Sequence, residues 1–295
     1  MYSNVQSFLS KKSEIEAIVA ENNFEILFFT EVWLTEDHSD CEISIKGFQA
    51  PVICKKNRGG TCIFAKEDIP LYEVTPPNPC EDSSWIVINS RNNVKRVYAS
   101  IYRSPNSTPE NNRKLVENIL WANQCFQEII LTGDFNYPEI NWDTETTIDN
   151  RSSDFIETIQ DIGFHQVIKE PTRYRIGQQP SLLDLILTTD EFSVKGVELK
   201  APFGKSDHLV IEFSVLNQHV QNEKRVDRLD MKQLDVDVFK GKMEAINWKL
   251  IFDSNNVDVI YQEIVCHVNK IVKEITPKCR KFKKNIAPWS TRKTH

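Results

Sequence analysis

The sequence predicts a layered α/β domain followed by a shorter helical segment, on three observations. Residues 1–214 alternate between short β-rich runs and helical patterns, which is typical of helices packed on sheets. The character of the chain changes after Leu216, where a polar stretch is typical of a linker. With 295 residues, 40% of them hydrophobic, the chain suits one large domain with an appendage or two domains of ordinary size.

The first half of the predicted domain starts with a helical pattern over about residues 10–22, where Ile15 and Ile18 share one face. Ser13 and Glu16 have the spacing of a capping box, in which each side chain bonds the other residue's backbone N–H. Runs rich in β-branched and aromatic residues then predict strands. These are EILFFT (25–30), TCIFA (61–65), WIVIN (85–89) and VKRVYASIY (94–102).

In the second half, Thr108 and Pro109 predict the start of a helix, because Thr is a preferred N-cap and Pro fits the first helical position. The remaining elements follow from apolar runs and helical spacing. We expect a strand at EIILT (128–132), a helix near 152–162, and strands at LLDLILTT (182–189) and HLVIEFSV (208–215).

The segment after Leu216 begins with the polar sequence NQHVQNEKRVDRLD. Beyond it, apolar residues recur at helical spacing and predict an amphipathic helix that packs on another surface. They are Val257, Ile260, Ile264, Val268, Ile271 and Ile275, and Pro277 ends the pattern. We therefore expect two domains, residues 1–215 and 216–295.

Composition excludes several classes of protein. The hydrophobic content rules out a disordered or fibrous chain. No apolar run approaches the ~18 residues of a membrane helix, and no secretory signal is visible at the start. The seven cysteines form no C-x-x-C pair, which predicts reduced thiols in an intracellular protein, without a disulfide-linked partner.

Charge is unevenly distributed along the chain. Seven of the 36 basic residues lie between Thr276 and His295, where there is no acid, so the rest is more acidic than the net charge of −6 suggests. An acidic body does not suit a protein that holds DNA by charge alone. It suits a metal enzyme whose cations offset its own carboxylates and a phosphate substrate. The alternative is that acidity only keeps a soluble domain monomeric.

Reactive side chains gather at the predicted strand ends, where α/β scaffolds present functional residues in loops. They are Glu31, Tyr102, Asp134, Asn136, Asp207 and His208. Asp184 lies instead within an apolar run, where an unpaired carboxylate is costly. Asp184 therefore needs a partner, and a histidine is a natural one.

The chain lacks a G-x-S-x-G elbow, a phosphate-binding G-x-x-x-x-G-K-[ST] loop, an H-E-x-x-H pair and a dinucleotide-binding G-x-G-x-x-G. The remaining carboxylates, amide and phenol are hard oxygen ligands, which favour Mg²⁺ or Mn²⁺ over Zn²⁺. Such an ion beside an aspartate-paired histidine suits phosphoester hydrolysis. Each residue alone has a structural interpretation as a cap, turn or core residue. The combination of types and order favours catalysis.

An ordered set of motifs resembles the endonuclease/exonuclease/phosphatase superfamily, which includes pancreatic DNase, apurinic/apyrimidinic endonucleases and inositol polyphosphate 5-phosphatases. The motifs are NVQS (4–7), TEVWL (30–34), IYRSP (101–105), TGDFN (132–136), SLLDLIL (181–187) and SDH (206–208). The stretch GFHQVIKEPTRYR (163–175) is similar to the endonuclease domain of non-LTR, jockey-type retrotransposon polyproteins. The resemblance covers about residues 4–214.

The resemblance implies a four-layer α/β sandwich of the DNase type, in which two mainly antiparallel sheets are flanked by helices. It also implies that Asn4 and Glu31 help to hold a catalytic Mg²⁺, with Asp207 near the metal. We expect the first strand to be truncated, because only three residues precede Asn4.

The same resemblance assigns roles in catalysis. Tyr102 is expected to bond the scissile phosphate, Asp134 to activate the water, and Asn136 to stabilise the phosphorane. His208 is expected to contact the phosphate, and Asp184 to fix the tautomer of His208 and raise its basicity.

The leading hypothesis is a Mg²⁺-dependent endonuclease that nicks DNA and leaves a 3′-hydroxyl, acting in the nucleus on chromosomal DNA and otherwise in the cytoplasm. A phosphatase of the same superfamily that acts on a small phosphate ester is one alternative. The other is a catalytically silent retrotransposon fragment. The retrotransposon resemblance also implies that residues 216–295, a polar linker plus a helical segment with a basic tail, are the remnant of the link to a missing reverse transcriptase.

Overall fold

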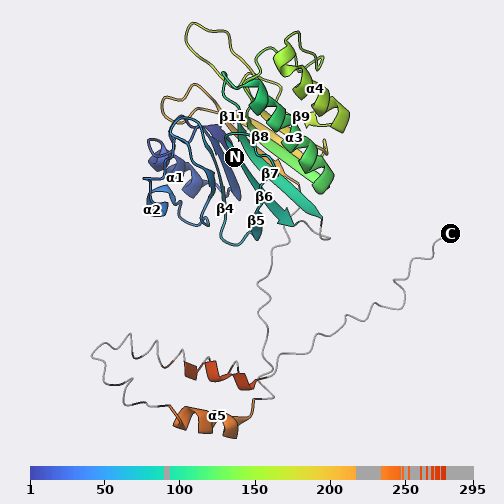
Figure 1. The fold of residues 1–295 in the computed structure, drawn as a ribbon. Coiled ribbons are helices and arrows are strands. Elements are labelled where there is room, and N and C mark those ends of the chain that lie inside the picture. Colours follow the sequence, from blue (N-terminus) through green and yellow to red (C-terminus); the bar gives the residue numbers. More distant parts are fainter. Residues whose placement is uncertain are drawn as a thin grey trace, which may run out of the picture. The chain divides into compact units, whose positions relative to one another are not determined.

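The computed structural model describes residues 1–89, 94–216 and 234–246, with single positions between 248 and 276 (Figure 1). The chain divides into two compact units, Met1–Asn222 and Glu223–His295. The first unit carries all twelve strands of the described chain, in two sheets of six.

The first sheet has the strand order β11-β12-β1-β2-β4-β3. Its strands are β1 (Tyr2–Asn4), β2 (Ile26–Thr30), β3 (Val52–Cys54), β4 (Thr61–Ala65), β11 (Val194–Lys200) and β12 (Val210–Val215). Only β1 and β2 run parallel, and the other neighbours are antiparallel. The first and last strands of the unit are therefore adjacent at the middle of this sheet.

The second sheet has the order β5-β6-β7-β8-β10-β9. Its strands are β5 (Leu71–Glu73), β6 (Ser83–Asn89), β7 (Lys95–Tyr102), β8 (Glu128–Asp134), β9 (His165–Gln166) and β10 (Asp184–Thr188). Here β7 and β8 are the one parallel pair. Each sheet is thus mixed and mainly antiparallel.

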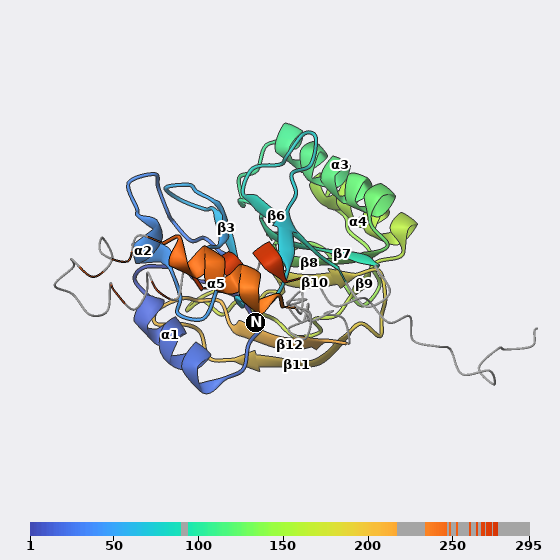
Figure 2. The same cartoon turned by 90° about the horizontal axis from the view of Figure 1, so that it is seen from below.

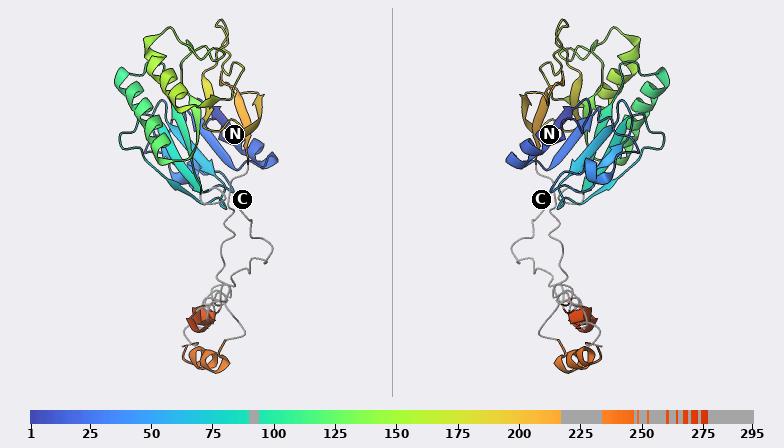
Figure 3. Two further views of the ribbon diagram at one scale, coloured as in Figure 1. Left: turned by 90° about the vertical axis from the view of Figure 1, so that its right-hand side faces the viewer. Right: turned by 90° about the vertical axis from the view of Figure 1, so that its left-hand side faces the viewer.

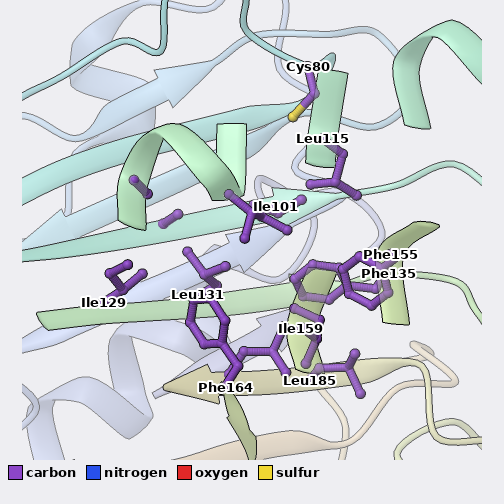
Figure 4. Packing of buried hydrophobic residues seen from close by; sticks show 14 of the residues in the cluster. Cys80, Ile101, Leu115, Ile129, Leu131, Phe135, Phe155, Ile159, Phe164 and Leu185 are labelled. Carbon is purple, nitrogen blue, oxygen red and sulfur yellow. The ribbon is translucent and has the colours of Figure 1, made fainter. Parts of the chain in front are cut away.

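Helices cover the outer faces of the two sheets (Figures 2 and 3). Helices α1 (Lys12–Glu21) and α2 (Asp40–Ile43) place Ile15 and Ile43 in the core beside the first sheet. Helices α3 (Pro109–Cys125) and α4 (Asn150–Ile162) pack on the second sheet, and Figure 4 shows Leu115 and Phe155 in that core.

A third apolar cluster lies between the sheets, where Phe28 from β2 stacks near Tyr98 from β7, with ring centroids 6.1 Å apart. The layers are helix, sheet, sheet and helix, as predicted. Alternate residues of the strands face the two sides of each sheet, and burying both sides stabilises this arrangement. The five cysteines in the described part of the chain are all free thiols.

One helix start was predicted wrongly and one correctly. The N-cap of α1 is Lys11, which makes no capping side-chain bond, so the capping box expected at Ser13 is absent. A capping box occurs instead at Ser39, which opens the short helix α2 that the sequence did not predict. Thr108 caps α3 as expected, because its Oγ1 accepts from the Asn111 N–H at 3.1 Å.

Strand β1 has three residues and pairs with strands on both sides. It meets β2 at three register positions but β12 only at Tyr2↔Ile211. The Met1 ammonium is buried and donates to the Ile26 carbonyl at 3.1 Å. Asn4 is therefore seated at the end of a central pair of strands.

In the second unit, α5 (Val236–Glu244) starts at Asp235, whose side chain accepts from the N–H groups of Asp237 and Val238. Lys242 forms an ion pair with Glu274 at 2.7 Å. The helical pattern expected from Val257 to Ile275 falls largely outside the described residues. Within the part that is described, no helix is long and apolar enough to cross a membrane.

Candidate active site

Three neighbouring strands of the second sheet present polar residues at one edge. Strands β7 and β8 are parallel, and they end side by side at Tyr102 and Asp134, which are paired in register. Strand β10 is antiparallel to β8, so its first residue, Asp184, lies opposite Asp134. Strand pairing alone therefore collects two of the predicted carboxylates and the tyrosine.

The first sheet contributes residues to the same site. Asn4 ends β1, Glu31 directly follows β2, and the loop before β12 supplies Asp207 and His208. The Asn4 amide joins the two sheets, because its Nδ2 donates to Glu31 Oε1 at 2.8 Å and to Asp134 Oδ2 at 2.9 Å.

Asp184 and His208 form a fully buried pair. The His208 Nδ1 lies 2.7 Å from Asp184 Oδ2. His208 is thus the histidine partner that the sequence predicted for the buried Asp184. Asp184 also accepts from the Tyr2 hydroxyl at 2.7 Å and from Thr172 Oγ1 at 2.6 Å. Three donors compensate the cost of burying this carboxylate.

The other nitrogen of His208 faces two acids. Its Nε2 lies 3.8 Å from Asp134 Oδ2 and 3.8 Å from Asp207 Oδ1. Burial opposes a charge on His208, but Asp184 and Asp134 outweigh it and raise the pKa of His208 to about 9. A histidine in this setting carries a proton at neutral pH.

Burial raises the pKa of Asp134 to about 8, and the nearby carboxylates of Asp184 and Glu31 act in the same direction, against the effect of His208. Burial likewise raises the pKa of Tyr102 well above its ordinary value, with Glu31 and Asp134 adding to the effect. Tyr102 therefore keeps its proton at neutral pH and can donate a hydrogen bond.

Asp207 is held by residues that the sequence did not single out. Its Oδ1 accepts from Gln6 Nε2 at 2.7 Å, and its Oδ2 accepts from Arg173 Nε at 3.0 Å. Burial works against the ionised form, yet His208, Arg173 and Gln6 together lower the pKa of Asp207. Asp207 is an anion fixed at the rim of the site.

Asn136 lies two residues beyond Asp134, in a left-handed backbone conformation with φ 48°. Its Nδ2 donates to the Arg103 carbonyl at 2.7 Å, and its own N–H donates to Asp134 Oδ1 at 3.2 Å. Glu31 has a similar φ of 50°. Left-handed conformations are costly for residues with side chains and often mark functional sites.

Gly133 makes this strand end possible. A Cβ atom at Gly133 would lie 1.9 Å from the Ile101 carbonyl oxygen, so no larger residue fits where β7 and β8 approach. The glycine of the predicted TGDFN motif is thus required by packing next to the site.

Four residues that support the site were not predicted from the sequence to belong to it: Tyr2, Gln6, Thr172 and Arg173. Hydroxyl and amide side chains near a strand carry no distinctive spacing, and their partners are distant in sequence. Tyr2 and Asp184, for example, are 182 positions apart. The available signals were that Gln6 lies within the motif NVQS (4–7) and that Thr172 and Arg173 lie within the family-like stretch 163–175.

The acidic groups here could hold a cation. Asp134, Asp184 and His208 each offer a ligand atom within 4.8 Å of the others. Asp184, however, already accepts three hydrogen bonds, and His208 is turned toward it. Glu31 and Asp134 converge on the Asn4 amide, and the partly exposed carboxylate of Glu31 supplies hard oxygen donors that fit a divalent ion such as Mg²⁺.

Comparisons with known proteins agree with this fold. Residues 97–212 match the family described as endonuclease-reverse transcriptase. This match confirms the predicted resemblance to the endonuclease/exonuclease/phosphatase superfamily and to its retrotransposon branch. A comparison with curated proteins finds no match.

Solved structures share the fold at low sequence identity. The endonuclease domain of TRAS1, a telomere-specific non-LTR retrotransposon, is 16% identical with a TM-score of 0.55, covering 73% of this chain and 96% of that one. The 3′-5′ exonuclease NExo from Neisseria meningitidis is 16% identical with a TM-score of 0.56, covering 72% and 98%. An AP endonuclease from Archaeoglobus fulgidus is 16% identical with a TM-score of 0.54, covering 73% and 98%.

Proposed function

We propose that the first unit is a divalent-metal-dependent endonuclease that hydrolyses DNA phosphodiester bonds, nicking one strand and leaving a 3′-hydroxyl. One observation carries the proposal. The buried Asp184–His208 pair presents a charged imidazole 3.8 Å from Asp134, at the edge where both sheets end. A fixed cation beside a basic carboxylate is what attack of water on a phosphodiester requires.

Asp134 is the proposed base. Burial, with the carboxylates of Asp184 and Glu31 nearby, raises the pKa of Asp134, so its ionised carboxylate is a stronger base than an ordinary aspartate. The water oxygen attacks phosphorus, its proton passes to Asp134, and the bond between phosphorus and the 3′-oxygen breaks as that oxygen takes a proton from a solvent water. The products are a 5′-phosphate and a 3′-hydroxyl.

His208 and Tyr102 are proposed to bind the phosphate through Nε2 and the phenolic hydroxyl. Asp184 orients His208 by the bond to Nδ1, which leaves the Nε2 proton directed at the site. Asn136 would stabilise the phosphorane from the loop after β8. These roles need no movement of the buried residues, because their hydrogen bonds are already in place.

Asn4 and Glu31 are proposed to hold Mg²⁺ or Mn²⁺, with Asp207 near the ion. When bound, the ion would offset the negative charge that develops on the phosphate oxygens. The carboxylate of Glu31 is only partly buried, so a hydrated ion can reach it.

DNA is the substrate we favour because of the proteins that share the fold. TRAS1 supplies an endonuclease domain, and another similar structure holds the Neisseria 3′ phosphatase NExo bound to a product DNA hairpin. The acidic composition of the chain also suits a substrate phosphate that is bound with a metal ion rather than by basic residues alone.

The test is a plasmid-nicking assay with the purified full chain. We expect Mg²⁺ or Mn²⁺ to convert supercoiled DNA to open circles and EDTA to stop the reaction. A folded sample that leaves the plasmid intact but releases phosphate from inositol or sugar phosphates would replace this proposal with the phosphatase. A folded sample that hydrolyses neither would identify a catalytically silent domain.

A further inference from the structure

A hollow of about 490 Å³ opens beside the proposed reaction centre. Glu31 and Tyr102 line it and also belong to the candidate active site. Its other walls come from Trp33, from Arg58 and the nearby Lys56 and Gly59, from Glu81 and Asp82, and from the loop that leads from β7 into α3. The volume lies in the range of ligand sites, which is roughly 300–1,000 Å³. When a phosphodiester lies at the reaction centre, the nucleoside on one side of it therefore lies in or over this hollow.

The floor of the hollow is rigid. Asp82 is buried in a left-handed conformation with φ 54°, and its carboxylate accepts from the Gly60 N–H at 2.8 Å and from Lys56 Nζ at 2.9 Å. Gly59 packs closely against Asp82 and Tyr102, because an added Cβ would be 3.1 Å from Asp82 Oδ1 and 3.2 Å from the Tyr102 ring. The shape of the hollow is thus fixed without a ligand.

Trp33 forms an exposed aromatic wall. The residue is 37% exposed, has a φ of 51°, and is held by its N–H, which donates to the Gly59 carbonyl at 3.1 Å. Val32, between Glu31 and Trp33, is completely buried and anchors the loop. Among the residues whose positions are described, no other aromatic ring stacks on Trp33.

Arg58 supplies a charge that the described protein does not neutralise. The neighbouring Lys56 is engaged by Glu81 and Asp82, at 2.8 and 2.9 Å. Arg58 is exposed, and no ion pair or hydrogen bond to it occurs within the described ranges. A guanidinium and an exposed aromatic face in the same hollow suit a ligand that carries both a phosphate and a flat ring.

We propose that this hollow receives the nucleotide adjacent to the scissile phosphate, with its base stacked on Trp33 and its outer phosphate against Arg58. The proposal rests on the function proposed above and adds a substrate contact to it. Stacking accepts any base, so the hollow adds affinity and positions the strand without selecting a sequence.

Equilibrium binding tests the hollow separately from catalysis. Anisotropy of a fluorescein-labelled DNA duplex is measured with the full chain in EDTA. We expect W33A to raise Kd about 5- to 50-fold, and W33F to raise it less than about threefold, because a phenyl ring still stacks. Y72A is the control, since Tyr72 is 42% exposed on β5, at the opposite end of the second sheet.

Salt dependence tests Arg58. Loss of one phosphate contact in R58Q should reduce the slope of log Kd against log salt concentration by about one. K95Q is the control, because exposed Lys95 starts the strand that ends at Tyr102. Neither control should change binding.

The outcomes separate the two proposals. If the wild-type chain nicks plasmid but W33A and R58Q bind like wild type, only the proposed hollow is overturned. If the wild-type chain neither binds duplex nor nicks plasmid, both proposals are overturned. Thermal melting of each variant confirms folding, and W33F and R58Q keep the test valid if W33A does not fold.

Discussion

The candidate site has two sides of contrasting construction. The buried side consists of Tyr2, Thr172, Asp184 and His208, each at most 3% exposed and joined by hydrogen bonds of 2.6–2.7 Å to Asp184. The open side consists of Glu31, Tyr102 and the hollow next to them, where side chains are partly exposed and the backbone repeatedly adopts positive φ.

The difference indicates which part of the site is preorganised before substrate binds. On the buried side the polar atoms around Asp184 already have partners, so its geometry is fixed by folding. On the open side, carboxylate oxygens, an indole face and a guanidinium face solvent. We therefore expect substitutions on the buried side to affect stability and rate together, and substitutions on the open side to affect ligand binding alone.

The largest effect is expected from His208→Ala, which removes the charged group aimed at the phosphate. Nicking should fall by about 10²–10⁴-fold, as for loss of a general acid–base group. The measurement is the initial rate of plasmid nicking at saturating Mg²⁺, with circular dichroism to confirm the fold. His165→Ala is the control, because the His165 side chain is 49% exposed at the start of β9. Equal rates for His208→Ala and wild type would refute the assigned role.

The pH dependence of stability should also distinguish the buried side. The pKa of His208 is about 9 in the folded protein, above its ordinary value of 6.5, so the folded state holds this proton more tightly. That contribution is complete below pH 6.5 and is lost as the pH rises through 9, on the order of 3 kcal/mol in total. Urea unfolding in EDTA should show it in wild type and not in His208→Gln. A constant difference between the two proteins from pH 6 to 10 would contradict this.

The main strands could be predicted from sequence because they are long and apolar, and the N-cap of α3 because Thr108-Pro109 is distinctive. Strands β3, β5 and β9 have only two or three residues, too few to show a period. Strand β11 is longer, but a register shift between Lys195 and Glu198 breaks its alternation. The order of strands in each sheet depends on distant pairings that local pattern does not encode.

The sequence could predict those parts of the site in which a buried polar group requires a hydrogen-bonding partner. Asp184 within an apolar run required a partner, and His208 is that partner. The role of Asn4 came only from the family resemblance, because an isolated asparagine has many uses. The role of Tyr2 could not be predicted, because its hydroxyl reaches Asp184 only through the position of β1 between β2 and β12.

Tyr2→Phe should therefore reveal a hidden contribution of the buried side. The change keeps the ring but leaves Asp184 Oδ1 without the donor at 2.7 Å. Loss of a bond to a buried carboxylate should lower the free energy of unfolding by about 2 kcal/mol. Urea titration at pH 7 measures it. Tyr72→Phe, on an exposed ring, should stay within about 0.5 kcal/mol of wild type. Equal stability of Tyr2→Phe and wild type would show that the buried bond is dispensable.

Glu31→Gln makes the smallest change in stability and tests the open side. The amide retains the size of the side chain and a hydrogen-bond acceptor for Asn4, and Glu31 is partly exposed, so the free energy of unfolding should change by less than about 1 kcal/mol. Because a neutral amide is a weaker ligand than a carboxylate, the Mg²⁺ concentration for half-maximal nicking should rise about tenfold. Glu36→Gln is the matched control, since the Glu36 side chain is 88% exposed in the loop after β2 and its ion pair among the described residues is with Lys55, at 3.4 Å. An unchanged metal titration with Glu31→Gln, or a loss of stability as large as that of Tyr2→Phe, would show that Glu31 belongs with the structural residues, and the distinction between the two sides would then fail.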